Sequence, residues 1–173
     1  TASALSGRGA RVREIELPPD FDRLYEDQIL IMHFEAARAL AWERFNHPDL
    51  LSGDLRDTLA GAAATPREQY DEAMRRARAC RQALAGFFAG SDVLLTVSAP
   101  GEAPAGIETT GNSLFNRNWT LLGVPCVTIP AGRGACGLPL GVQFVGSYDE
   151  DARVLLAAEW ARRASDLESP DPQ

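Results

Sequence analysis

The side chains that most often carry out hydrolysis or bind metals are few and widely separated in this sequence. Its two histidines, His33 and His47, have no second histidine or cysteine at the spacing of metal ligands. No HExxH, CxxC or carboxylate cluster is present, and no serine lies in a nucleophile-elbow pattern. We therefore interpret His33, which lies inside an apolar helical pattern, as structural, and His47 as a solvated loop residue. The sequence predicts no catalytic residue and no metal site in this chain.

Lysine does not occur in this chain, since all 17 basic residues are arginine. Schiff-base chemistry, a P-loop and a serine–lysine pair each require a lysine, so these residues cannot supply any of the three. The turn that contains Gly134 and Gly137 lacks the strand–GxGxxG–helix context of a dinucleotide site. The sequence therefore predicts no cofactor.

A group of arginines between residues 67 and 81 could indicate an anion-binding site. Acidic residues are interleaved with them, however. Asp71 precedes Arg75 by four residues, and Glu72 precedes Arg76 by the same spacing. Pairs with this spacing meet on the surface of a helix. We therefore interpret these arginines as part of a solvated, ion-paired helix face.

The three cysteines, Cys80, Cys126 and Cys136, share no metal-binding or redox spacing. The first lies in a helical pattern and the second in a strand pattern, so we interpret both as small buried thiols. An odd number of cysteines without a disulfide framework is typical of a reducing compartment. We therefore expect a cytoplasmic protein.

Length, charge and hydropathy restrict the class of protein further. A chain of 173 residues is enough for one domain, which buries roughly two thirds of its unfolded surface. A net charge of −7 argues against binding to nucleic acid or to an anionic membrane. No apolar run approaches the length of a membrane span. We expect neither nucleic acid nor a membrane among the partners.

The elements that would position any site are organised around the stretch from Phe115 to Gly146. Val124 to Ile129 is a short apolar run closed by Pro130, which is typical of a buried strand. A glycine-rich turn over 133–137 leads to a returning strand over 140–145. From pattern alone this stretch predicts a hairpin in an α/β core.

Helical periodicity and capping residues predict the other elements. Ser113 at an N-cap and Gly123 at a C′ position bracket a short helix before the first of these strands. One long helix should bury a continuous stripe, formed by Tyr25, Ile29, Met32, Ala36 and Leu40. Leu24, Ile31 and Phe34 lie on neighbouring faces of the same helix, so we expect it to be buried on more than one side. The last helix, from Asp149, should bury Val154, Ala158 and Ala161. The remaining predictions are helices over 21–45, 50–64 and 65–90 and strands over 11–17 and 92–98.

The sequence GVPCVTIPAG, followed by GLPLGVQFVG and a helix from Asp149, resembles the C-terminal end of the amidase signature family. The resemblance continues upstream through residues 92–96, 98–100 and 34–43, and it extends from about residue 10 to residue 163. Within the family the chain is most similar to the malonamidase-like branch, which acts on small amides that carry a carboxylate. Thr120 stands where many members have asparagine, which argues against the glutaminyl-tRNA amidotransferase branch.

This resemblance implies an α/β fold, a mixed sheet with helices packed on it, that corresponds to the C-terminal part of the amidase fold. It also implies hydrolysis of a carboxamide C–N bond through an acyl-enzyme, by a Ser–Ser–Lys mechanism. The lysine and the Gly/Ser-rich segment of that mechanism do not occur in these residues. The chain alone should therefore be inactive. Pro100, Thr109 and Thr110 would be walls of the substrate pocket, although the loop that holds them could equally be an ordinary connection.

The resemblance also implies a division of the chain and a set of partners. We expect residues 1–164 to form the C-terminal segment of an amidase domain and residues 165–173 to form a disordered tail. The partners would be a small amide substrate and the missing N-terminal half. A sheet that continues into that half would leave a strand edge and an apolar face uncovered here, which favours a homo-oligomer. A non-catalytic binding or scaffold module and an unrelated α/β enzyme remain as alternatives.

Overall fold

The computed structural model describes residues 1–164. These residues form two compact units. The first combines Thr1–Leu17 with the chain from Gln82 onward, and the second is Pro18–Arg81. The first unit contains the sheet, whereas the second is helical. The boundary between the units falls within one long helix, α5 (Arg67–Ala85).

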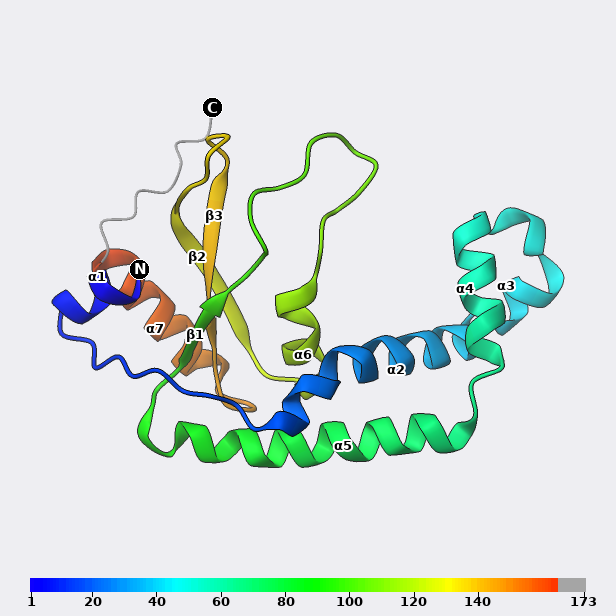
Figure 1. The fold of residues 1–173 in the computed structure, drawn as a ribbon, viewed down its shortest axis with the longest axis horizontal. Helices are drawn as coiled ribbons and strands as arrows, with labels where there is room; N and C mark the ends of the chain where they lie inside the picture. The colour runs from blue at the N-terminus through cyan, green and yellow to red at the C-terminus, as the bar shows by residue number, and fades with distance from the viewer. Residues whose placement is uncertain (165–173) are drawn as a thin grey trace. The chain divides into compact units, whose positions relative to one another are not determined.

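The sheet of the first unit has three strands: β1 (Leu94–Val97), β2 (Cys126–Arg133) and β3 (Pro139–Val145). β3 lies in the middle and pairs antiparallel with both neighbours, so the order is β1-β3-β2 (Figure 1). The α/β class predicted from the sequence is confirmed, and the strand pairs formed within residues 1–164 are all antiparallel.

The predicted helix and hairpin are confirmed, with one change in the first strand. The helix α6 (Leu114–Leu122) ends at Gly123, whose φ of 65° places it in the left-handed region that favours glycine. β2 does not end at Pro130 as predicted but continues to Arg133. A register shift between Pro130 and Gly132 forms a bulge on this edge strand, where a residue without a backbone N–H is tolerated.

One face of the sheet is covered by the last helix, α7 (Asp151–Ala164) (Figure 1). All three residues predicted for its buried face are buried, as the apolar periodicity indicated. They pack with residues of β2 and β3 and with one residue of the N-terminal helix α1 (Ala2–Gly7), which together form a core of Leu5, Ile129, Val142, Phe144, Val154, Ala158 and Ala161.

The strand predicted over Arg11–Leu17 is wrong. This segment carries no regular secondary structure, and it pairs with no strand among residues 1–164. Ile15 and Leu17 are only partly buried. An alternating pattern indicates that a segment can form a strand, but the strand also needs a partner edge to supply its hydrogen bonds.

The second unit is built from α-helices joined by short 3₁₀ turns. Its elements are η1 (Pro19–Arg23), α2 (Leu24–Ala39), α3 (Ala41–Asn46), η2 (Pro48–Leu50), α4 (Gly53–Ala63) and most of α5, which is followed in the first unit by η3 (Gly86–Gly90). Ser52 caps α4 by accepting a hydrogen bond from the amide of Leu55. α2 and α4 pack together around Ala37, Leu59 and Ala62.

The single long helix predicted over 21–45 is instead two helices separated at Leu40. The backbone there has φ −97° and ψ 24°, which is outside the α-helical region. The fully buried face of α2 is not the predicted stripe but a neighbouring face, with Leu24, Asp27, Ile31, Phe34 and Ala37 as its buried residues. Of these, Leu24, Ile31 and Phe34 were predicted to lie beside the stripe on a helix buried on more than one side. Both sets have helical spacing, so periodicity alone could not choose between the two faces.

No helix within residues 1–164 is long and apolar enough to cross a membrane. The disordered tail predicted for residues 165–173 lies outside the described residues.

Candidate functional site

The long connection between β1 and α6 borders a groove at one end of the sheet. This groove, which we call the loop groove, has a volume of about 710 Å³ and is lined by residues 98–104, 110–112, 128–130 and 139–141. Its walls therefore come from the connection on one side and from β2 and β3 on the other. It is the candidate functional site because it includes two of the three residues predicted to form a substrate pocket.

The predicted wall residues are not all placed alike. Pro100 and Thr110 line the loop groove, whereas Thr109 is not among its lining residues. The Thr109 hydroxyl oxygen instead accepts a hydrogen bond from the amide of Gly111 at 3.1 Å. All three residues are exposed. Their contact with a substrate stays a prediction.

Gly141 of β3 lines the loop groove close to two hydroxyl-bearing residues that also line it, Ser98 and Thr128. A Cβ atom added at Gly141 would lie 2.8 Å from the Ser98 Oγ and 2.5 Å from the Thr128 Cγ2. No larger residue fits there without a shift of the neighbours. Asn116 of α6 donates a hydrogen bond to the Ser98 carbonyl oxygen at 3.1 Å, which fixes the end of β1.

Gln143 lies two residues further along β3, on the same face of the sheet. It stands between Thr96 of β1 and Thr128 of β2 in the ladder, and it is only 2% exposed. Its Oε1 has no hydrogen-bond partner among the described residues. Sequence reasoning missed Gln143, because a polar residue in a strand pattern is equally consistent with a solvated face.

Cys126 also differs from its prediction. Cys80 is buried as predicted, but Cys126, predicted to be buried, is exposed at the edge strand β2. Local burial of its sulfur still raises the pKa of the Cys126 thiol, and a hydrogen bond with Gln143 partly offsets that rise. The strand pattern could not show which residue would lie at the sheet edge.

Glu102 is the charged residue among those that line the loop groove. Its carboxylate accepts hydrogen bonds from the amide of Cys136 at 3.0 and 3.1 Å and from the amide of Leu138 at 2.7 Å. These hydrogen bonds, that of Cys136 first, lower the pKa of the Glu102 carboxyl. Sequence reasoning missed Glu102 as well, because its partners are 34 and 36 residues away.

A second groove, which we call the edge groove, follows the outer edge of β1. It has a volume of about 1200 Å³ and is lined in part by Val12, Leu95, Leu156 and Trp160. β1 pairs only with β3 within residues 1–164, so its outer backbone edge is open there. Charged residues also line the edge groove, among them Asp92, Glu150 and Arg153, and Arg153 forms ion pairs with both of these acids. The loop groove is the better candidate site because it contains Pro100 and Thr110, which were predicted to line a substrate pocket.

The two histidines do not assemble a catalytic set among the described residues. His33 is partly buried in α2, and His47 ends α3 with its ring 4.6 Å from that of Trp42. Both lie in the second unit, whereas the loop groove belongs to the first. Within residues 1–164 no group of three or more His, Cys, Asp or Glu side chains could hold a metal ion.

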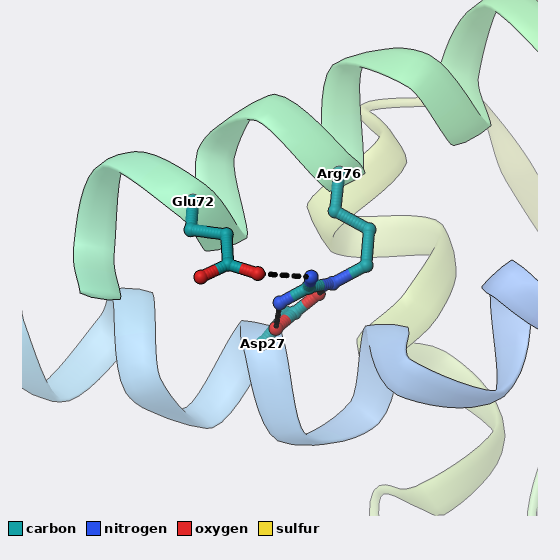
Figure 2. A network of polar contacts seen from close by, with 3 residues as sticks. All are labelled: Asp27, Glu72 and Arg76. Carbon is teal, nitrogen blue, oxygen red and sulfur yellow. Dashed lines mark hydrogen bonds and ion pairs between the residues drawn. The ribbon is translucent and has the colours of Figure 1, made fainter. Parts of the chain in front are cut away.

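The arginine group of α5 contains a buried ion pair rather than an open anion site. Arg76 donates to both carboxylate oxygens of Asp27, at 2.6 and 2.9 Å, and to Glu72 at 3.1 Å (Figure 2). The predicted pair of Glu72 with Arg76 is confirmed, but Asp71 pairs with Arg67 and not with Arg75. Because the Arg76 guanidinium is already paired with Asp27, Arg76 offers no free anion site. The network instead stabilises the second unit.

Comparison with known proteins gives the context for these grooves. Residues 1–155 match the family model described as Amidase. A glutamyl-tRNA(Gln) amidotransferase subunit of Neisseria meningitidis is 26% identical over 202 aligned residues, which cover 100% of this chain and 42% of that protein. Its counterpart in Ralstonia nicotianae is 34% identical over 110 residues, covering 60% of this chain and 22% of that protein.

Solved structures show the same fold. A crystal structure described as an amidase has a TM-score of 0.84 and 30% identity, and the match covers 94% of this chain and 39% of that one. The corresponding glutamyl-tRNA(Gln) amidotransferase subunit of Thermotoga maritima has a TM-score of 0.71 at 20% identity, covering 97% and 38%. This second likeness shows the fold alone. The chain spans less than half the length of these relatives.

Proposed function

Because this chain belongs to the amidase family, we propose that it forms part of an enzyme that hydrolyses a carboxamide C–N bond. The observation that carries the proposal is the family match over residues 1–155, which includes both walls of the loop groove. Its described residues would contribute a supporting core and one wall of the substrate cavity.

In this proposal the catalytic residues come from polypeptide outside these 173 residues. A serine Oγ attacks the amide carbonyl carbon and passes its proton, through a second serine and a lysine, to the leaving amine. Water then cleaves the resulting ester and releases the carboxylate. The absence of lysine from this chain supports an external origin of the base. The chain's own role is to shape the loop groove that would hold the amide.

The substrate that we propose is a small amide that carries a carboxylate, as in the malonamidase-like branch that the sequence resembles. A second candidate is an amidotransferase component that releases ammonia from an amide. It is favoured by the curated relatives, which are named as subunits of glutamyl-tRNA(Gln) amidotransferases. Thr120 favours the first candidate, because it replaces the asparagine common at that position. Its hydroxyl donates back to the Asn116 carbonyl oxygen, at 3.0 Å within α6.

We further propose that a second copy of the chain covers the edge groove, which gives a homo-oligomer. Apolar surfaces and open strand edges of this kind are usually covered by association. Light scattering of the purified chain should give a mass above that of one chain at micromolar concentration. A purely monomeric species would contradict this part of the proposal.

A chimera tests the enzymatic proposal. This chain would replace the matched 39% of the solved amidase that is 30% identical to it. The chimera should hydrolyse a simple aryl amide or malonamate, whereas the isolated chain should not. The same amidase without the replaced part is the matched control, and it should be inactive.

The outcomes separate the possibilities. Hydrolysis by the isolated, pure chain would overturn the view that its catalytic residues lie elsewhere. A folded chimera without hydrolysis would favour the alternative of a non-catalytic binding or scaffold module. Ammonia release from glutamine in preference to malonamate would favour the amidotransferase candidate.

A further inference from the structure

We propose that Glu102 is a positioning residue that holds the loop wall of the loop groove against the turn between β2 and β3, and so sets the width of the groove. The inference rests on the proposed function in one respect only, the role of the groove as a substrate wall. The contact between the Glu102 carboxylate and the amides of Cys136 and Leu138, which we call the latch, can be tested without any enzymatic activity.

The hydrogen bonds of Glu102 attach its loop, which makes few other hydrogen bonds, to the turn between β2 and β3. Within residues 1–164, the hydrogen bonds that connect the loop of residues 99–111 to another element are those from the amides of Cys136 and Leu138 to Glu102. The other bond made by this stretch, from the Gly111 amide to Thr109, stays within it. Most of the stretch is exposed and has no regular secondary structure. One carboxylate therefore fixes the position of a wall that little else restrains.

The turn is already built to present its amides to a carboxylate. The amide of Gly134 donates to the Leu138 carbonyl oxygen at 2.9 Å, and that of Gly137 donates to the Gly134 carbonyl oxygen at 3.0 Å. Arg133 donates to the Gly137 carbonyl oxygen at 2.8 Å. These bonds fix the turn and leave the amides of Cys136 and Leu138 for Glu102. Hydrogen bonds from N–H groups to a carboxylate are stronger than neutral ones.

Gly134 makes room for this contact. A Cβ atom added there would overlap both Cγ and Cδ of Glu102, closer than side chains approach one another. The backbone of Gly134 is not in the left-handed region, so alanine can adopt its conformation without strain. The turn and the loop are therefore fitted to each other at two positions that lie far apart in the sequence. A substitution at either position should break the same contact.

The consequence for the groove follows from where these residues lie. Glu102 and Pro100 both line the loop groove on the loop side, whereas residues 139–141 line it from β3. When the carboxylate leaves the turn, the loop wall is free to move away from the strands. A bound amide then loses contacts that it makes equally in the ground state and the transition state. Loss of such uniform binding raises KM and leaves kcat unchanged.

Amide hydrogen exchange at Cys136 and Leu138 tests the latch directly. We expect Glu102→Ala and Gly134→Ala each to increase exchange at both amides by about tenfold or more, since each removes charge-assisted hydrogen bonds. Glu102→Gln keeps one acceptor oxygen and should give a smaller increase. If both alanine variants break one contact, the double variant should exchange no faster than either single variant.

Two matched controls lie in the same loop. Gly101→Ala adds the same methyl group at a site where a Cβ atom would meet nothing within 4 Å. Glu108→Gln removes the same charge from an exposed position. Both should leave exchange at Cys136 and Leu138 unchanged. If the two alanine variants keep their far-UV circular dichroism and exchange at the rate of the unmodified chain, the latch is overturned.

The positioning role is tested in the active chimera described above. Glu102→Ala should raise KM for the amide severalfold, about three- to tenfold, with kcat unchanged, and Glu108→Gln should alter neither. Faster exchange without a rise in KM would overturn the positioning role while the latch stands. A chimera that never hydrolyses amides would count against the proposed function, whereas the exchange measurements would still decide the latch.

Discussion

The buried ion pair between Asp27 and Arg76 gives the sharpest stability prediction. The Asp27 side chain is 4% exposed and that of Arg76 is 23% exposed. The guanidinium binds both carboxylate oxygens of Asp27 and also reaches Glu72 on the surface (Figure 2). Arg76→Ala would leave a carboxylate buried without a counter-charge. We expect the free energy of unfolding to fall by about 3–5 kcal/mol, the usual result of removing one partner of a buried pair.

That loss is large against the total stability of a domain, which is about 5–15 kcal/mol. With a urea m-value of about 2 kcal/mol/M, it would lower the unfolding midpoint by about 2 M. Urea unfolding followed by circular dichroism measures both the midpoint and the slope. The hydrogen bond to Asp27 raises the pKa of Arg76 further above its already high ordinary value. A base whose pKa is higher in the folded state than in the unfolded state loses its stabilising effect only as pH rises through these two pKa values. Both pKa values of Arg76 lie far above neutral pH, so its stabilising effect is fully present there.

Three further variants isolate the cause. Arg75→Ala, an exposed neighbour on the same helix, should change the stability by no more than about 0.5 kcal/mol. Arg76→Lys keeps the charge but not the two parallel bonds, and should lose about 1.5–3 kcal/mol. Replacing both Asp27 and Arg76 with leucine should recover much of the loss, since no charge is left buried. If Arg76→Ala were as mild as Arg75→Ala, the reasoning about the buried charge would be refuted.

Four other predictions concern single features of the chain. Gly123→Ala should lower the free energy of unfolding, measured with urea, by about 1–2 kcal/mol, because alanine disfavours the left-handed conformation of this residue. Gly61→Ala, inside α4, should raise it by about 0.4–1 kcal/mol, because alanine has less conformational freedom to lose on folding. Hydrogen bonds from Arg162 and Arg163, one turn further along α7, lower the pKa of Glu159 to about 2. Its stabilising effect should therefore be complete above the ordinary glutamate pKa and disappear as pH falls towards 2, and an NMR titration that gives Glu159 an ordinary pKa would contradict this. A thiol reagent should label exposed Cys136 rapidly in the native chain and Cys80 only on unfolding, because Cys80 is buried and its thiol pKa is raised by burial.

Several elements of the first unit could be predicted from the sequence because their signals are local. Gly123 ends α6 in the left-handed conformation, and the glycine-rich turn joins β2 to β3. The apolar face of α7 is the one that its periodicity indicated. In each case the residues that determine the structure lie within a few positions of one another, where backbone sterics and helical spacing operate.

The sequence was less informative where two faces or two partners were possible. The stripe from Tyr25 to Leu40 and the observed buried face of α2 both have helical spacing, and packing chose between them. Asp71 had an arginine four residues away on either side, and it pairs with Arg67. The alternating pattern of Arg11–Leu17 indicated a strand, but no ladder forms there within residues 1–164.

The sequence by itself determined the resemblance to amidases, the absence of lysine, and the presence of a hairpin preceded by a short helix. Only the tertiary structure placed Glu102 against the amides of Cys136 and Leu138, and Asp27 against Arg76. It also separated Pro100 and Thr110, which line the loop groove, from Thr109, which does not. The physical reason is the distance along the chain. Capping, turns and periodicity depend on neighbouring residues, whereas a carboxylate bound by amides 34 or more residues away depends on how the intervening elements pack.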